Sequence, residues 1–380
     1  MFKRKRRGRR LKRYHRSYYS GRGRAKRVGG LVLLVALVFG VGWLAGPHLL
    51  DLGTGFWYGV VKGRDTSDSR PAGSTAAAQS GQTAQSGAAS QPQPTATPEP
   101  TALPEVLQPT AQIVEGPWVT VNLSALGSPE AVRTAAESAA AGGAQYALIT
   151  LKDTSGHLYY ASQVAAAQRS IAASTVDAAA VAAAFKAAGV TPVASLAAFR
   201  DPIAAYTARA MGIHYANSDY MWLDNTAAAG GKPWLNPYSS LAVGFVGDLV
   251  AEVHGLGYDH VVLTRVQFPW QVSTKQDYGE TGGLDRAGAL AAAITAWDER
   301  FAGEVTLWYE YEYGECAAAS QSLGALPAQL GAANLLMRVD AGDEENPGPT
   351  AEQVDAAVQA AKAGGASYVV VRQGTAAAFR

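Results

Sequence analysis

Residues 234–269 read WLNPYSSLAVGFVGDLVAEVHGLGYDHVVLTRVQFP and contain one complete helix-and-strand unit. The segment SSLAVGFVGDLVAEVHGLG predicts a helix that ends at glycine, and HVVLTRVQFP predicts the strand that follows it. The strand is a run of apolar residues rather than an alternation of apolar and polar ones. Because such runs are typical of parallel strands covered on both faces, this unit predicts an α/β fold.

The same unit recurs along residues 117–380. Further strands are expected at 118–126, 146–153, 191–201, 304–314, 334–342 and 367–373. Helices are expected at 128–143, 175–189, 202–212, 284–303 and 350–365. At least seven strands with intervening helices predict a (β/α)8 TIM-like barrel. A doubly wound open sheet is the alternative, but no GxGxxG motif follows the first strand.

The charge of the chain is divided unevenly. The formal net charge is +1, yet residues 1–27 contain 14 of the 32 Lys and Arg residues and none of the 31 acidic ones. The remainder of the chain is therefore acidic. Oppositely charged parts of one chain usually meet different environments.

An uncharged, mostly apolar stretch follows the basic tail, with no charged residue between Arg27 and Asp51. It is long enough for the roughly 20 residues that cross a bilayer, and predicts a transmembrane helix at residues 28–50. The basic flank predicts a single-pass protein of the cell membrane, with a cytoplasmic N-terminus and an extracytoplasmic C-terminal domain. A cleaved signal peptide is the alternative, but no clear A-x-A cleavage site is present.

The regions on either side of this predicted signal anchor have distinct partners and roles. We expect the tail at 1–27 to contact anionic lipid head groups rather than nucleic acid, because it directly abuts the span. Residues 51–116 are rich in Ala, Ser, Gln and Pro and contain few large apolar residues. Such a segment cannot bury enough surface to offset its ordering entropy, so it predicts a disordered stalk.

Cysteine and histidine usage argues against a metal centre. Cys316 is the only cysteine, and the six histidines show no metal-ligand spacing such as HExxH. We therefore expect no metal and no cofactor.

In a barrel of this class, functional residues gather at the carboxyl ends of the strands. Those ends offer carboxylates, arginines and aromatic rings, a mixture that suits a carbohydrate. The candidate catalytic residues are Asp153, Glu310 and Glu312. The candidate substrate-binding residues are Lys152, Asp201, Trp222, Asp224, Trp234, Arg265 and Asp340. Structural roles are the alternative: a polar strand end for the glutamates, a buried core for the tryptophans, and solvated loop pairs for the aspartates.

Three stretches carry a resemblance to a known family: residues 147–162 (ALITLKDTSGHLYYAS), 191–205 (TPVASLAAFRDPIAA) and 234–269. They resemble a bacterial family of predicted glycoside hydrolases, first defined as a domain of unknown function. The resemblance implies a (β/α)8 fold and a secreted or anchored protein that acts on surface polysaccharide or cell-wall glycan.

The chain departs from that family at two signatures. The family's Asp-Val-Lys-Asp resembles Thr150-Leu151-Lys152-Asp153, and its Asp-Tyr-(Ile/Val)-Arg-Phe-Pro resembles residues 264–269, with Thr264 for Asp and Gln267 for Arg. Hydrolysis of a glycoside normally needs two carboxyl groups. The substitutions favour a degenerate enzyme that binds polysaccharide without cleaving it. The alternatives are an active enzyme rebuilt around other carboxylates and an envelope scaffold that contacts proteins.

Overall fold

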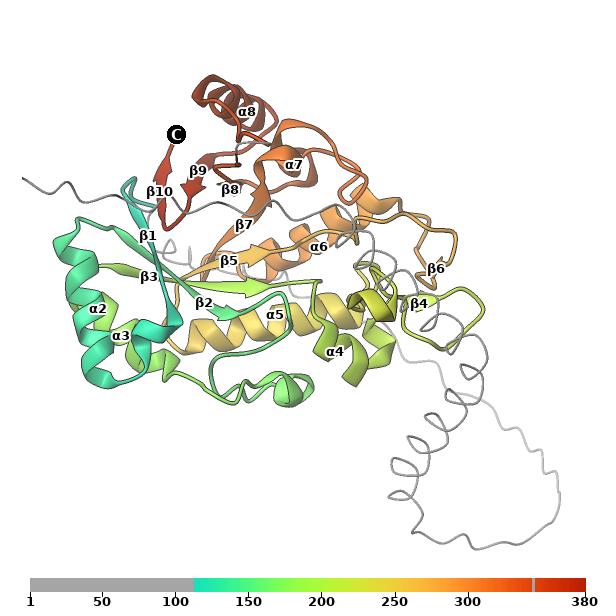
Figure 1. The fold of residues 1–380 in the computed structure, drawn as a ribbon, viewed down its shortest axis with the longest axis horizontal. Coiled ribbons are helices and arrows are strands. Elements are labelled where there is room, and N and C mark those ends of the chain that lie inside the picture. Colours follow the sequence, from blue (N-terminus) through green and yellow to red (C-terminus); the bar gives the residue numbers. More distant parts are fainter. Residues whose placement is uncertain (1–112, 344–345) are drawn as a thin grey trace, which may run out of the picture. The chain divides into compact units, whose positions relative to one another are not determined.

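The structure, a computed structural model, describes residues 113–343 and 346–380 (Figure 1). The basic tail, the predicted span at 28–50 and the predicted stalk up to residue 112 lie outside the described residues. Within residues 113–343 and 346–380, no helix is both long and apolar enough to cross a membrane.

Strands from the described residues close into a barrel, as the sequence predicts. In chain order they are β1 (Trp118–Val121), β2 (Tyr146–Lys152), β3 (Thr191–Ala197), β5 (His260–Thr264), β7 (Thr306–Glu312), β8 (Asn334–Val339), β9 (Tyr368–Gln373) and β10 (Ala376–Phe379). Around the barrel the order is β1-β10-β9-β8-β7-β5-β3-β2. Every pair of neighbours from β1 to β9 is parallel, and each of these strands was expected. The fold is therefore a TIM-like α/β barrel.

The strand β10 differs from the eighth strand of a regular (β/α)8 barrel. It pairs antiparallel with both β9 and β1, and it closes the ring between them. Two residues, Gly374 and Thr375, connect β9 to β10, and Gly374 takes a positive φ of 61°. A parallel pairing would need a crossover connection of a dozen or more residues. The two-residue connection between β9 and β10 therefore permits only an antiparallel arrangement.

The six helices predicted within residues 117–380 all form, and the described residues contain one short α-helix that was not predicted. They are α2 (Pro129–Ala141), α3 (Ala178–Ala187), α4 (Pro202–Thr207), α5 (Ser240–Gly255), α6 (Arg286–Arg300) and α8 (Ala351–Ala363), with α7 (Tyr313–Ala317) as the addition. The six predicted helices start alike, with a Ser, Thr or Asp side chain accepting a hydrogen bond from the backbone N–H three residues later. Such caps satisfy donors that the first helical turn leaves free.

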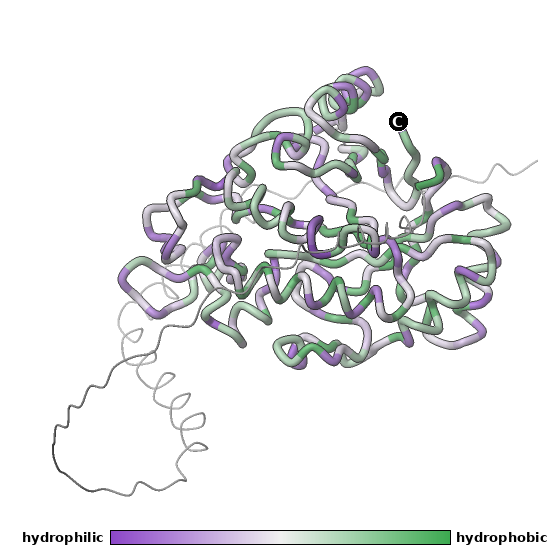
Figure 2. The backbone as a smooth tube through the Cα atoms, turned by 180° about the vertical axis from the view of Figure 1, so that it is seen from behind, coloured by the Kyte–Doolittle hydropathy of each residue, from purple (hydrophilic) through white to green (hydrophobic). Residues whose placement is uncertain are grey.

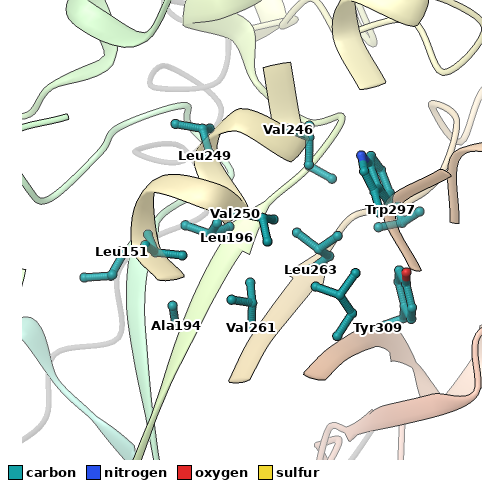
Figure 3. Close-up of a cluster of buried hydrophobic side chains, with 14 of the residues drawn as sticks. Leu151, Ala194, Leu196, Val246, Leu249, Val250, Val261, Leu263, Trp297 and Tyr309 are labelled. Atoms are coloured by element: carbon teal, nitrogen blue, oxygen red, sulfur yellow. The ribbon is translucent and has the colours of Figure 1, made fainter. Parts of the chain in front are cut away.

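One hydrophobic layer lies between the barrel and its helices. Leu249 and Val250 of α5 pack in the same cluster as Leu196 of β3 and Val261 of β5, and all four side chains are buried (Figure 3). Figure 2 shows hydrophobic segments concentrated along the central strands and hydrophilic ones mainly on the outer helices and loops. Burial of apolar surface on this scale is the main favourable contribution to folding.

A second hydrophobic cluster is formed by the opposite faces of the same strands, and so fills the barrel. Its buried members are Trp118, Tyr146, Leu148, Val193, Val262, Trp308, Leu336, Val370 and Ala377. Because strand side chains alternate between faces, the next residues on this inward face lie nearer the carboxyl ends of the strands. Those residues form the candidate site.

A small excursion projects beyond the carboxyl ends of β3 and β5. Its strands, β4 (His214–Tyr215) and β6 (Gln276–Asp277), pair antiparallel and lie outside the barrel near α4 (Figure 1). A separate hydrophobic cluster of Ile213, Trp222 and Trp234 anchors this excursion.

Candidate functional site

The inward faces of the strands become polar towards their carboxyl ends. Thr150 of β2, Thr264 of β5 and Glu310 of β7 continue the inward faces that begin with the buried apolar cluster, and Thr264 is directly opposite Glu310 in the register of β5 and β7. We call this polar end of the barrel the mouth. It is the end at which barrels of this class hold their sites.

Glu310 is a largely buried carboxyl group in the mouth. Its Oε2 lies 2.8 Å from Nη2 of Arg372, and the two side chains are 13% and 17% exposed. Burial raises the pKa of Glu310, and the positive charges of Arg372 and Arg338 oppose that rise. The carboxyl group of Glu310 therefore retains a proton more readily than that of a free glutamate, even though the guanidinium of Arg372 contacts it.

Glu312, two residues further along β7, is held by two arginines. Arg338 donates from Nε to Oε2 at 2.8 Å and from Nη2 to Oε1, while Nη2 of Arg265 lies 3.1 Å from Oε1. The hydrogen bond that Arg338 donates to Glu312 also raises the pKa of Arg338. Both carboxylate oxygens of Glu312 are thus engaged by cations.

Arg265 reaches Glu312 from an unusual backbone conformation. It directly follows β5 and has a φ of +56°, in the left-handed region that bulky residues rarely adopt. Such a conformation costs of order 1–3 kcal/mol, and residues that hold it cluster at functional sites. The same guanidinium lies 5.5 Å from the ring of Trp270.

Glu315, which the sequence analysis did not single out, supports the turn after β7. Its Oε2 accepts a hydrogen bond from the backbone N–H of Glu312 at 3.2 Å, and its Oε1 accepts one from Ser322 at 3.3 Å. Burial raises the pKa of Glu315. The contact with the N–H of Glu312 is one half of a capping box at the start of α7, in which Glu312 holds the N-cap position that Ser or Thr usually occupies.

Lys152 and Asp201 form a buried ion pair that joins the ends of β2 and β3. Nζ of Lys152 is 2.9 Å from Oδ2 of Asp201, and neither side chain is exposed. Asp201 also caps α4 by accepting from the N–H of Ala204 at 2.8 Å. Asp201 therefore pairs with Lys152 rather than with its neighbour Arg200, and the contacts of both residues are structural.

The other aspartates named from the sequence are differently placed. Asp153 accepts hydrogen bonds from the N–H groups of Ser155 and His157 and from the hydroxyl of Tyr159, and so holds together the loop after β2. Asp340 is at the mouth, 3.6 Å from Nη2 of Arg338, with its side chain 73% exposed.

The two tryptophans named from the sequence are core residues of the excursion. Trp222 is 4% exposed and Trp234 is 0% exposed. Asp224 accepts from Nε1 of Trp234 at 3.0 Å and from the backbone N–H of Lys232 at 2.7 Å. These three residues build the excursion rather than offer a free aromatic face.

An exposed aromatic ring is supplied instead by Trp270, which the sequence analysis missed. It is 42% exposed, and its ring meets that of Trp234 edge-on at a centroid distance of 5.1 Å. Its position, directly after the QFP segment of residues 267–269, was the available signal. Gln267 itself is 1% exposed, and its Nε2 has no hydrogen-bond partner among the described residues.

The part of the chain that the structure describes contains no group of three or more His, Cys, Asp or Glu side chains that could hold a metal ion. Cys316 is buried, and burial raises the pKa of its thiol to about 12. Such a thiol is protonated at neutral pH and is a poor nucleophile. The charged groups gathered at the mouth are therefore carboxylates and arginines.

Residues 119–303 match a family model described as "Putative glycosyl hydrolase domain" (DUF4015). This part of the chain is therefore similar to that family. The family match covers β1 to α6 and ends before β7, so Glu310 and Glu312 lie outside it. No curated protein sequence matches the chain.

Solved structures match parts of the chain at low similarity. A hypothetical protein from Ruminiclostridium thermocellum ATCC 27405 is 19% identical, with a TM-score of 0.44 over 50% of this chain and 96% of that one. The GH20 β-N-acetylhexosaminidase from Streptomyces coelicolor A3(2) is 12% identical, with a TM-score of 0.41 over 67% of this chain and 47% of that one. A chitobiase from Flavobacterium johnsoniae is 12% identical, with a TM-score of 0.40 over 68% of this chain and 38% of that one. Likenesses this weak say nothing about the chemistry of the mouth.

Proposed function

We propose that the barrel binds polysaccharide at its mouth without hydrolysing it, as a degenerate member of its glycoside hydrolase family. The observation that carries the proposal is the engagement of Glu312 by Arg265 and Arg338. A glycosidase needs one carboxyl group to protonate the leaving oxygen and one free carboxylate as nucleophile or base. Here Glu312 already has cations at both oxygens.

The positive charge of the arginines around Glu310 and Glu312 also disfavours the transition state of glycoside hydrolysis. Glycoside hydrolysis passes through a state that resembles a cationic oxocarbenium ion. Arg338 and Arg372 place positive charge beside the carboxylates that would have to stabilise that cation. Thr150 and Thr264, at the two strand positions where the family has carboxylates, add no negative charge. The site is therefore better suited to ground-state binding than to bond cleavage.

The same groups suit the binding of a sugar. Arginine N–H groups and threonine hydroxyls at the mouth can bond to sugar hydroxyls, and the exposed face of Trp270 can stack on an apolar face of a sugar ring. Polar groups that fix orientation beside an aromatic surface are the usual composition of a ligand site.

A second candidate function is hydrolysis with Glu310 as the general acid. The observation in its favour is the raised pKa of this buried carboxyl group, a property shared by the acids of glycosidases. This mechanism would require Arg372 to leave Oε2 of Glu310 when substrate binds.

We also propose that residues 28–50 anchor the protein in the cell membrane and that the barrel faces the cell envelope. The support is the uncharged stretch with its basic flank. A stalk at 51–116 would let the barrel reach glycan away from the bilayer, and the tail at 1–27 would lie against anionic lipids. Protease protection in spheroplasts tests this topology, because only the tail and the span should then be protected.

The experiment that tests the function uses the full-length chain in detergent with a panel of wall and capsular glycans. Retention on each glycan and release of reducing ends are measured together. We expect retention without release, and retention should fall about tenfold or more in Trp270→Ala because a buried aromatic anchor usually dominates a binding site. Leu241→Ala, which removes a 60% exposed apolar side chain from α5, is the control and should change neither.

Three results are informative. Release that disappears in Glu310→Gln would establish the hydrolase and overturn the degenerate enzyme. Retention without release that depends on Trp270 supports the proposal. A folded chain that neither retains nor releases any glycan would favour a protein-contacting scaffold.

A further inference from the structure

Arg200 is a half-buried cation that has no ion partner among residues 113–343 and 346–380. It follows β3, and its guanidinium lies 5.3 Å from the ring of Trp270 and 5.9 Å from that of Trp234. It forms no ion pair and no hydrogen bond with any described residue, and its Nε is buried without a partner. A buried donor without an acceptor is costly, so the Nε of Arg200 favours a ligand that supplies an acceptor.

The carboxylate with most influence on Arg200 does not neutralise it. Asp224 acts on Arg200 through its charge, yet its two oxygens accept from the N–H of Lys232 and from Nε1 of Trp234. Burial and the nearby charge of Arg265 both lower the pKa of Arg200. An anion placed here would relieve both effects at once.

A second guanidinium faces the same aromatic ring. Arg265 lies 5.5 Å from the ring of Trp270, and its Nη2 contacts one oxygen of Glu312. Trp270, 42% exposed, is therefore flanked by two arginines, of which Arg200 forms no ion pair with a carboxylate among the described residues. Arginine presents five N–H donors in a planar fork that matches the geometry of carboxylate and phosphate.

We propose that Arg200, Arg265 and Trp270 form a subsite for the acidic group of an anionic polysaccharide, with the sugar ring against Trp270. This inference rests on the proposed function, because it assigns the class of glycan that the mouth binds. The acidic group is a uronate carboxylate or a phosphodiester, which the same guanidinium groups would recognise.

The test is calorimetric binding by the full-length chain in micelles that contain anionic lipid, which occupies the basic tail. Three short probes are compared: trigalacturonate, a glycerol phosphate trimer and neutral maltotriose. We expect an acidic probe to bind, with affinity that falls as salt rises. Arg200→Gln should weaken its binding about ten- to hundredfold, the usual effect of losing a charged hydrogen bond. Arg200→Lys should recover part of the loss.

Arg133→Gln is the matched control. It makes the same change of net charge on the outer helix α2, where the side chain is 65% exposed, and should leave binding unchanged. Preference for trigalacturonate or for the phosphate probe identifies the acidic group. Equal effects of the two Gln variants would overturn the subsite, as would failure of both acidic probes to bind. Binding of maltotriose alone that requires Trp270 would overturn the anion subsite and leave the proposed function intact.

Discussion

Replacement of Lys152 by methionine should unfold the barrel at a much lower temperature. The Nζ of Lys152 and Oδ2 of Asp201 are 2.9 Å apart with no exposure of either side chain. Methionine has a similar shape and no charge, so this change leaves the carboxylate of Asp201 buried without its cation. The sequence offered Lys152 as a substrate-binding residue, and this variant separates the two roles.

The size of the effect follows from the burial. Removing one partner of a buried ion pair costs about 3–5 kcal/mol, because the remaining charge is uncompensated. For a domain of this size, 1 kcal/mol lowers the midpoint of thermal unfolding by roughly 2–4 °C. The midpoint should therefore fall by about 6–20 °C.

Thermal unfolding of the full-length chain, followed by near-ultraviolet circular dichroism, measures this shift. Lys186→Met is the control, since Nζ of Lys186 and Oδ2 of Asp259 are 2.8 Å apart but the two side chains are 45% and 35% exposed. An exposed pair contributes about 0–1 kcal/mol, so the control should melt within a few degrees of the natural chain. In Lys152→Met combined with Asp201→Asn, the asparagine oxygen can still cap α4 and no buried charge remains, so much of the loss should be recovered.

Equal melting temperatures for Lys152→Met and Lys186→Met would refute the reasoning. So would a normal melting temperature for Lys152→Met together with weakened glycan binding, because Lys152 would then act on the ligand rather than on the fold.

Three further predictions concern the barrel. Gly156→Ala should lower the melting temperature measurably, because Gly156 has a φ of +86° and a Cβ there would lie 2.4 Å from Oδ1 of Asp201; an unchanged melting curve would contradict this. Burial lowers the pKa of His260 to about 4, from 6.5 in the unfolded chain, so the free energy of unfolding should fall by up to about 3 kcal/mol as the pH drops from 6.5 to 4. Urea unfolding of the natural chain and of His260→Gln at pH 7 and pH 4.5 measures this loss. Equal losses of stability in the two chains would refute the prediction. Thr264→Asp should release no reducing ends from any glycan, because the new carboxylate would lie opposite Glu310 while Arg372 remained bound to Glu310. Turnover in this variant would show that Arg372 does not prevent hydrolysis.

The architecture could be predicted because the hydrophobic period and the length of each strand and helix depend on residues that are close together in the sequence. Each parallel strand is an apolar run, and each of the six predicted helices begins with a capping residue. The strand β10 was missed because AAAF lacks the β-branched residues typical of strands, and its order depends on closure of the barrel. The two-residue strands β4 and β6 are too short to leave any periodic signal.

The mouth was predicted less completely. The period of two placed Glu310 and Glu312 on one face of β7, and the structure has both on the inward face. Trp222 and Trp234 were named as candidate substrate-binding residues with a buried core as the alternative, and the structure buries both rings. Their sequence gives no sign that the excursion folds over its own core. Whether a tryptophan is a ligand surface or a core residue is decided by its neighbours in space.

The arginine contacts show most clearly why a single sequence is insufficient. Arg338 reaches Glu312 because β7 and β8 are neighbours in the barrel with these two residues in register. Arg265 reaches the same carboxylate from β5 by way of a left-handed backbone that no local signal predicts. A glutamate at the end of a barrel strand is a typical candidate for a catalytic group, yet the fold places two arginines beside Glu312, one by strand register and one by a left-handed backbone. If the mouth derives from an active site, the loss of hydrolysis therefore involves arginines placed beside the remaining carboxylates as well as the replacement of carboxylates by threonine. Replacing Thr150 and Thr264 by aspartate without removing Arg338 should consequently not restore hydrolysis.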